Sequence, residues 1–184
     1  NISADYGGSE AGVIPFSLAL TELGRACAST AVAMSVNNLV GEVVQSIGTE
    51  DQKKKYIPKL CSGEFACASF CLTEAGAGSD PSRLKTLAIK DGAEWVINGS
   101  KMWISSAEYA GFFVVWAVTD SSLPAGKGIS CFLIDADNPG LTIGPAENKM
   151  GQQASSTNSV HFDNCRISNS AMLGTEILGF KIAV

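Results

Sequence analysis

The sequence predicts an α+β protein in which a helical segment is followed by a β domain. Apolar residues recur at helical spacing through the first third of the chain, and after Gly63 they alternate in short runs punctuated by Gly, Pro, Asn and Asp. The 184 residues, of which 46% are hydrophobic and 17% charged, suffice for a sizeable buried core. We therefore expect a partial N-terminal helical domain at residues 1–65, an antiparallel β-barrel or sandwich at 66–174, and the start of a further helical domain at 175–184.

Three helices are expected in the first domain. The first opens at Pro15 and carries apolar residues at helical spacing, namely Leu20, Leu23 and Cys27. The second ends at Gly48 and has an apolar stripe made of Val40, Val43, Val44 and Ile47. Thr49–Gln52 has the form of a capping box, with Thr as N-cap and Gln at N3, and it begins a third helix that we expect Pro58 and Gly63 to end.

Strands are expected through the β domain. The stretches Lys90–Ala93 and Asn98–Gly99 have the composition of hairpin turns and enclose a short strand, Glu94–Ile97. Further strands are expected at residues 65–72, 101–105, 112–118, 129–134, 141–143 and 159–162.

Composition and charge argue against nucleic-acid binding and against a membrane-spanning segment. The formal net charge is −5 and the pI is near 4.8, so the chain lacks the basic footprint of a nucleic-acid-binding protein. Its only basic run, Lys53–Lys55, follows Glu50 and Asp51 and fits a solvated helix face. No apolar stretch reaches the length of a membrane span.

The cysteines and the histidine limit which disulfide, metal and catalytic sites the chain can form. The six cysteines form no CxxC motif and no signal-peptide pattern is present, which indicates reduced thiols inside a cell. The one histidine, His161, lies in an alternating run that favours a strand residue over a zinc ligand or a catalytic base.

The stretch Thr73–Asp80 concentrates hydroxyls, carboxylates and glycines after an apolar strand and before Pro81. Such a loop can form a nest of backbone N–H groups that binds a phosphate, or it can be a tight surface turn. A dinucleotide-binding fingerprint fails, because Pro81 stands where the third glycine or alanine belongs, and the sequence has no GxxxxGK[ST] motif.

Trp103 and Ser105 lie two residues apart in an expected strand, so their side chains share a face. A planar heteroaromatic ligand can stack on the indole while the hydroxyl bonds a ring nitrogen. The alternative is a core tryptophan beside an incidental serine, and the same core role is expected for Trp95 and Trp116.

The order and spacing of several segments resemble the acyl-CoA dehydrogenase family, flavoproteins that introduce a trans-2,3 double bond into a coenzyme A thioester. The segments that carry the resemblance are Tyr6–Gly8, Ala26–Thr30, Gly48–Tyr56, Leu72–Asp80, Asn98–Ser105, Lys127–Ser130, Lys149–Gly151 and Gly179–Ala183.

The resemblance implies FAD as cofactor and assigns the flavin site to two segments. The first comprises Phe70, Cys71, Leu72, Thr73, Gly78 and Ser79. In it, Thr73 bonds the flavin ring, and Ser79 lies near the FAD phosphates and the coenzyme A chain of the substrate. The second comprises Trp103 against the isoalloxazine, Ile104, and Ser105, whose hydroxyl bonds flavin N5. The chain departs from the family pattern at Ala75, usually Pro, and at Ser105, usually Thr.

The resemblance also implies what this chain lacks. In the family, a glutamate of the C-terminal helical domain removes the substrate α-proton, so we expect no catalytic base here and an inactive fragment. Glu74 belongs to the FAD loop and is not assigned that role. The segment Ser35–Asn38 resembles the short-chain branch, and the loop lacks the arginine of glutaryl-type enzymes, which favours a short or compact acyl group.

Partners and compartment follow from the same resemblance. Electron-transferring flavoprotein is the expected electron acceptor and a homotetramer the expected assembly, in the bacterial cytoplasm or, alternatively, in the mitochondrial matrix. The other readings are an acyl-CoA oxidase and a non-catalytic flavin- or acyl-CoA-binding relative.

Overall fold

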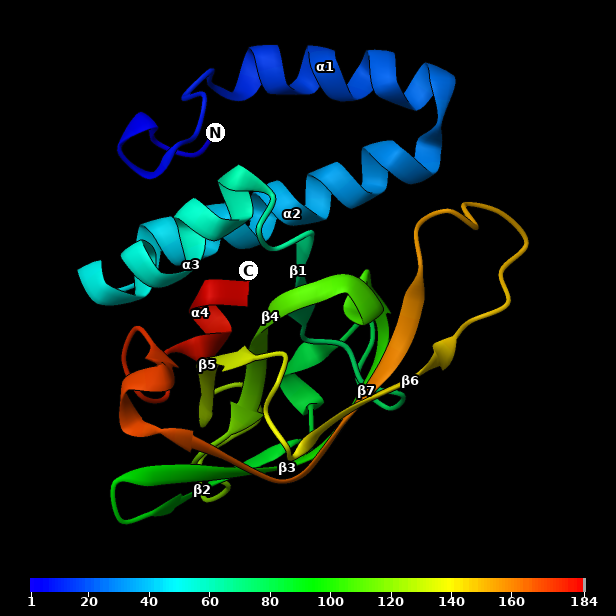
Figure 1. Cartoon of the computed structure of the whole chain (residues 1–184). Helices are drawn as coiled ribbons and strands as arrows, with labels where there is room; N and C mark the ends of the chain where they lie inside the picture. The colour runs from blue at the N-terminus through cyan, green and yellow to red at the C-terminus, as the bar shows by residue number, and fades with distance from the viewer. Residues whose placement is uncertain (184) are drawn as a thin grey trace.

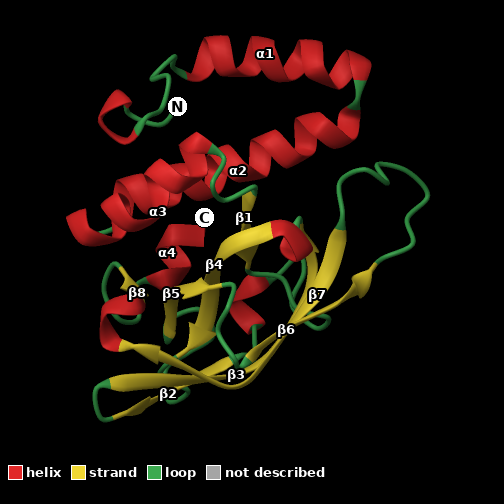
Figure 2. Cartoon of the chain, viewed as in Figure 1, coloured by secondary structure: helices red, strands yellow, loops and turns green. Residues whose placement is uncertain are grey.

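The computed structural model describes residues 1–183, in which a layer of helices covers one face of a bent β-sheet (Figure 1). The helices are α1 (Val13–Ala26), α2 (Ala28–Ile47) and α3 (Glu50–Ser62), with the short α4 (Gly179–Ala183) at the other end of the chain. Helix α2 packs on α1, α3 and strand β1, and α1 is the outermost of the three (Figure 2). No helix within the described residues combines the length and the apolar character needed to cross a membrane.

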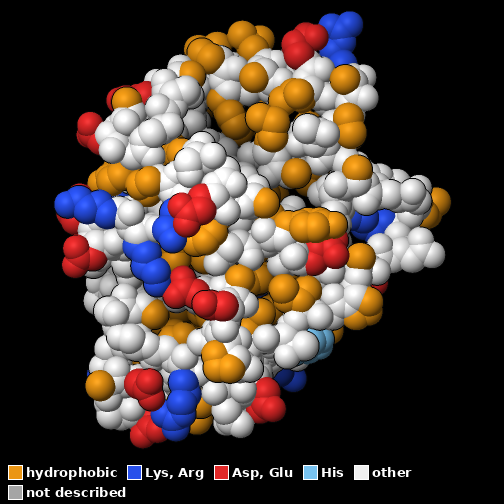
Figure 3. Space-filling view, in the orientation of Figure 1, with side chains coloured by type: hydrophobic (Ala, Val, Ile, Leu, Met, Phe, Trp, Pro, Cys, Tyr) orange, Lys and Arg blue, Asp and Glu red, His pale blue; other side chains and the backbone are white. Residues whose placement is uncertain are grey.

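The three helices form where the sequence predicts them, although α1 begins at Val13 rather than Pro15 and ends before Cys27. The stripe of α2 places Val40 and Val44 in the core, whereas Ile47 is partly exposed. Figure 3 shows hydrophobic side chains gathered over the outer helices, and α1 exposes Val13, Ile14 and Leu18.

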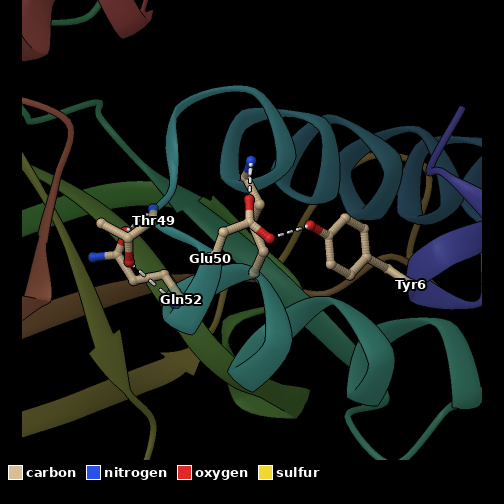
Figure 4. Close-up of polar contacts among 5 residues, drawn as sticks. Tyr6, Thr49, Glu50 and Gln52 are labelled. Carbon is tan, nitrogen blue, oxygen red and sulfur yellow. Dashed lines mark hydrogen bonds and ion pairs between the residues drawn. The ribbon is translucent and has the colours of Figure 1, made fainter.

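The predicted capping box begins α3. The Thr49 hydroxyl accepts a hydrogen bond from the Gln52 N–H at 3.3 Å, and the Gln52 side-chain oxygen accepts from the Thr49 N–H at 2.9 Å (Figure 4). The Gln52 amide group also donates to the carbonyls of Ser170 and Met172, both at 2.9 Å. This one side chain therefore caps the helix and ties it to the far end of the sheet.

The prediction that Pro58 ends α3 was wrong, because the helix runs on to Ser62 and only Gly63, at φ +80°, ends it. A proline within a helix leaves the carbonyl four residues earlier without its N–H partner. That residue is Lys54, which is exposed, so water can satisfy the carbonyl.

The β domain is one sheet of eight strands. Their bounds are β1 Cys67–Cys71, β2 Leu87–Asp91, β3 Glu94–Ser105, β4 Ala110–Val118, β5 Ile129–Asp135, β6 Leu141–Ala146, β7 Thr157–Ser168 and β8 Met172–Leu173. The order is β6-β7-β3-β2-β4-β5-β8, with β1 paired to β4. The α+β class is confirmed, but the sheet is open and mixed rather than a closed antiparallel barrel, since β1 and β2 both pair with β4 in parallel.

The expected turn at Asn98–Gly99 was also wrong, whereas the turn at Lys90–Ala93 joins β2 to β3 as predicted. Strand β3 continues through Asn98–Gly99, where a register shift against β7 marks an irregularity. Gly99 has φ +151°, and a Cβ there would lie 2.6 Å from the Thr86 hydroxyl oxygen. Glycine is needed here for close approach between backbones and not for a turn.

Strands β4 and β5 are buried on both faces. Phe112 and Trp116 of β4 share a core with the helices, where the Phe112 and Tyr56 rings are 4.6 Å apart. The opposite face of the same strands lies inside the bend of the sheet, where Phe132 of β5 packs 5.6 Å from Trp95 of β3. This double burial explains the nearly continuous apolar runs of both strands. The domain boundaries at residues 65 and 174 stay a prediction.

Replacement of Gln52 by Ala should lower the free energy of unfolding by about 2 kcal/mol, since it removes one capping bond and leaves two carbonyls without their donor. The exposed Lys54→Ala substitution in the same helix should change it by less than about 0.5 kcal/mol. Urea unfolding measures both. Equal stability of the two variants would contradict the assigned role of Gln52.

Candidate functional site

The structure brings the Thr73–Asp80 loop against strand β3, the two segments to which the sequence assigns a ligand. The loop leaves β1 at Cys71, and the Met102 N–H of β3 donates to the Thr73 carbonyl at 2.9 Å. Within the loop, Glu74 and Ala77 exchange backbone hydrogen bonds at 3.3 and 3.0 Å, which closes a tight turn.

A buried ion pair lies beneath this contact. The Lys101 ammonium group donates to the Glu74 carboxylate at 2.8 Å and to the Leu72 carbonyl at 3.1 Å. The Lys101 side chain is fully buried and that of Glu74 is 9% exposed. The carboxylate also accepts from the backbone N–H groups of Lys85 at 2.6 Å and Thr86 at 2.9 Å. Both of its oxygens therefore accept hydrogen bonds from the protein.

The pKa values of the pair reflect this arrangement. Burial by itself would raise the pKa of Glu74, but the charge of Lys101 and the hydrogen bonds that the carboxylate accepts outweigh it and hold that pKa below its ordinary value. Burial lowers the pKa of Lys101, and the carboxylate of Glu74 opposes that effect.

Trp103 presents its indole to solvent beside the loop. It is 54% exposed, whereas Trp95 and Trp116 are core residues, as the sequence indicated. Its backbone is left-handed, with φ +61°, at a register irregularity between Lys101 and Ile104. An exposed aromatic side chain on strained backbone is a feature that functional sites often retain. The core alternative for Trp103 is therefore wrong.

Ser105 is half-buried at the end of β3. Its carbonyl accepts a hydrogen bond from the Ser69 hydroxyl at 2.8 Å. Among the described residues none is hydrogen-bonded to the Ser105 hydroxyl, so this group is free to bond a ligand.

The other assigned residues divide into buried and exposed groups. Cys71 and Ile104 are buried, and burial raises the pKa of the Cys71 thiol far above its ordinary value. The half-buried Phe70 packs its ring 4.3 Å from that of Trp116. Their side chains therefore support the site from within, whereas Gly78 and Ser79 lie exposed on the loop.

The exposed side of the loop borders open space. A Cβ added at Gly76 or Gly78 would meet no protein atom within 4 Å. Within the described residues, no protein group accepts from the N–H groups of Gly78 and Ser79. The loop can therefore approach a flat or phosphorylated ligand with free backbone donors, and together with the exposed indole it fits a flavin nucleotide.

Two cavities lie outside the face formed by the loop and Trp103. The larger, about 940 Å³, is lined by the start of α3, the end of β5 and residues 166–174. A second, about 290 Å³, lies between Ser82–Leu84 and residues 118–129, just beyond the loop. The face formed by the loop and Trp103 borders neither cavity, and its residues Gly78, Ser79 and Trp103 are exposed. His161 lies in β7 as expected, and no metal-binding cluster of His, Cys, Asp or Glu is found in the part of the chain that the structure describes.

Sequence reasoning missed Lys101. The alternation in β3 carried the signal, because Lys101 shares its parity with Trp95 and Ile97, both of which face the core. A lysine on a core face requires a buried anionic partner, and Glu74 in the adjacent loop supplies it.

Comparison with known proteins identifies the family. Residues 1–64 match the model of the acyl-CoA dehydrogenase N-terminal domain, and residues 69–165 match that of the middle domain. The chain belongs to the acyl-CoA dehydrogenase family.

Three members illustrate the relationship. The chain is 45% identical to the short/branched chain specific acyl-CoA dehydrogenase, mitochondrial, of Rattus norvegicus, over 100% of this chain and 42% of that protein. Butyryl-CoA dehydrogenase from Megasphaera elsdenii superimposes with a TM-score of 0.93 at 35% identity, over 98% of this chain and 48% of that one. A glutaryl-CoA dehydrogenase from Mycobacterium smegmatis, in complex with FADH2, superimposes with a TM-score of 0.88 at 34% identity. The match covers 96% of this chain and 44% of that one. The chain spans less than half the length of these relatives.

The stability that Glu74 confers should be lost in acid. Because its folded pKa is lowered, the contribution is fully present above the ordinary value of 4.5 and disappears as the pH falls through the folded pKa. The difference in urea midpoint between the wild type and Glu74→Gln should therefore shrink from neutral pH to about pH 3. A difference that stays constant over this range would show that the carboxylate charge is not what stabilises the fold.

Proposed function

We propose that this chain forms the flavin-facing and part of the acyl-CoA-facing surface of an FAD-dependent acyl-CoA dehydrogenase, which converts an acyl-CoA to the trans-2-enoyl-CoA. The observation that carries the proposal is the joining of the Thr73–Asp80 loop to the exposed Trp103 by the hydrogen bond from Met102 to Thr73. The glutaryl-CoA dehydrogenase that shares the fold forms a complex with FADH2, which supports a flavin as the ligand of this face.

Each exposed residue has a role in this proposal. The Trp103 indole packs against the flavin ring, and the free Ser105 hydroxyl bonds the ring at N5. Thr73 bonds the ring edge, and the N–H groups of Gly78 and Ser79 face the phosphates. Ser79 also borders the coenzyme A chain. When bound, FAD supplies the acceptor for the hydride that leaves the substrate β-carbon.

The α-proton goes to a base that we place outside these 184 residues. Glu74 is an unsuitable base, since its carboxylate is paired with Lys101 and accepts two backbone hydrogen bonds. A general base must have a free acceptor within reach of the proton that it removes.

Substrate, acceptor and assembly follow from the family. A short or branched acyl group is favoured by the names of the rat and Megasphaera relatives. We further propose electron-transferring flavoprotein as the electron acceptor and a tetrameric assembly. The rat relative is described as mitochondrial, which favours the mitochondrial matrix over the bacterial cytoplasm.

The proposal predicts that the full-length protein containing this chain is purified with visible flavin absorption bands, and that anaerobic butyryl-CoA bleaches them. Flavin bands that persist after the addition would contradict dehydrogenation of a short acyl-CoA. Reoxidation by oxygen as fast as by electron-transferring flavoprotein would favour an acyl-CoA oxidase.

Trp103→Ala should weaken FAD binding about fivefold or more, because an aromatic stacking contact contributes about 1 kcal/mol beyond its buried area. Trp103→Phe, which keeps a flat ring, should stay within about threefold of the wild type. Fluorescence titration of the apoprotein with FAD measures both. Equal affinities of the Ala and Phe variants would exclude stacking on this residue.

A further inference from the structure

We propose that the buried Lys101–Glu74 ion pair is a positioning device that sets the distance and angle between the flavin-facing loop and the Trp103 strand. The inference rests on the proposed function, since it takes this face to be the flavin site. In this inference, the two buried side chains need not touch the cofactor. They control the positions of the residues that do touch it.

Three consecutive residues of the loop are fixed to two consecutive residues of β3. The Leu72 carbonyl accepts from the Lys101 ammonium group at 3.1 Å, and the Thr73 carbonyl accepts from the Met102 N–H at 2.9 Å. The Glu74 carboxylate pairs with the same ammonium group at 2.8 Å. The buried ammonium nitrogen of Lys101 in β3 therefore holds both Leu72 and Glu74 of the neighbouring flavin-facing segment.

The pair also ties the loop to the start of the next strand. The Glu74 carboxylate holds the N–H groups of Lys85 and Thr86, and the Thr86 carbonyl accepts from the Val118 N–H of β4 at 2.8 Å. The second cavity, which Ser82–Leu84 and Val118 help to line, lies along this connection. The ion pair thus couples the turn of the loop to both of its flanking segments.

Among the described residues, those that follow Glu74 in the loop make no hydrogen bond to β3, and Ala77 alone of them is buried, in the core shared with the helices. Ala75, Gly76 and the stretch from Gly78 to Asp80 are exposed, and the bonds between Glu74 and Ala77 are internal to the turn. They hold the turn together but do not fix it to β3. Without Lys101, the Met102–Thr73 hydrogen bond would be the one backbone link between Leu72–Asp80 and β3 among the described residues.

A buried pair of this kind adds little net stability compared with apolar residues of the same volume, whereas removing one partner leaves an uncompensated charge. A double variant that removes both charges therefore distinguishes a pair that only stabilises the fold from a pair that positions the loop. Part of the stability lost in Lys101→Met should return in the double variant in either case, because no buried charge is left unpaired. Flavin affinity should stay low only if the pair sets the geometry.

The experiment compares Lys101→Met, Glu74→Gln and their combination in the full-length protein. Met approximates the length of Lys without its charge, and Gln keeps one of the two oxygens, which can accept from one of the two backbone N–H groups. Lys55→Met is the matched control, because Lys55 pairs with Asp135 at 2.7 Å on the exposed surface, away from the loop. Urea midpoints, FAD dissociation constants and amide hydrogen exchange of the apoprotein are measured for each variant.

In Lys101→Met and in the double variant, the FAD dissociation constant should rise about tenfold or more, because a hydrogen bond to a charged group is lost from the support of the loop. The Lys85, Thr86 and Met102 amides should also exchange about tenfold faster in the apoprotein. The double variant should regain part of the urea midpoint that Lys101→Met loses, because it no longer holds an unpaired buried charge. Lys55→Met should match the wild type in FAD affinity and in exchange at these amides.

Recovery of FAD affinity together with stability in the double variant would overturn the inference and leave the pair a structural one. Unchanged affinity in the double variant would overturn it as well, whatever the exchange rates. If Lys101→Met alone does not fold, the neutral double variant decides the question. A wild-type protein that binds no FAD would instead overturn the proposed function, a result that the variants cannot produce.

Discussion

A buried lysine requires a fixed anion, and this requirement organises the surface that we assign to the flavin. Lys101 lies on the core face of β3 and is fully buried, so its charge is tolerated only because Glu74 reaches it from the adjacent loop. The contact fixes Leu72 and Thr73 as well, and it leaves the glycines of the loop and the Trp103 indole facing outward. The exposed groups of this surface thus depend on a buried ion pair for their positions.

The surrounding fold supplies a rigid base for this arrangement. Strand β1 runs parallel to β4, with Cys71 beside Val115, so the loop leaves β1 beside the deeply buried strand β4. Because β4 is packed on one face by the helices and on the other by the bend of the sheet, its position is determined from both sides. Loops on such a scaffold can carry functional groups while the elements that bear them stay fixed.

Local features of this fold were predictable from the sequence, and long-range ones were not. The Thr49–Gln52 capping box and the stripe of α2 are local patterns; the box forms as predicted, and the stripe is buried at Val40 and Val44 but exposed at Ile47. Asn98–Gly99 has the composition of a turn, but pairing with β7 carries β3 straight through it. Tertiary pairing likewise decides that the sheet is open and mixed. For the candidate site, the sequence singled out the two segments that the structure brings together. Lys101 emerges only when alternation is followed from Trp95 to Lys101, which the expected turn at Asn98–Gly99 prevented.

A structure of the full-length protein with FAD bound tests the central claim most directly. The account predicts that the flavin ring lies against the Trp103 indole with its N5 edge at the Ser105 hydroxyl, and that the Lys101–Glu74 pair lies intact beneath the loop. A flavin located elsewhere, such as in the 940 Å³ cavity beside α3, would contradict it.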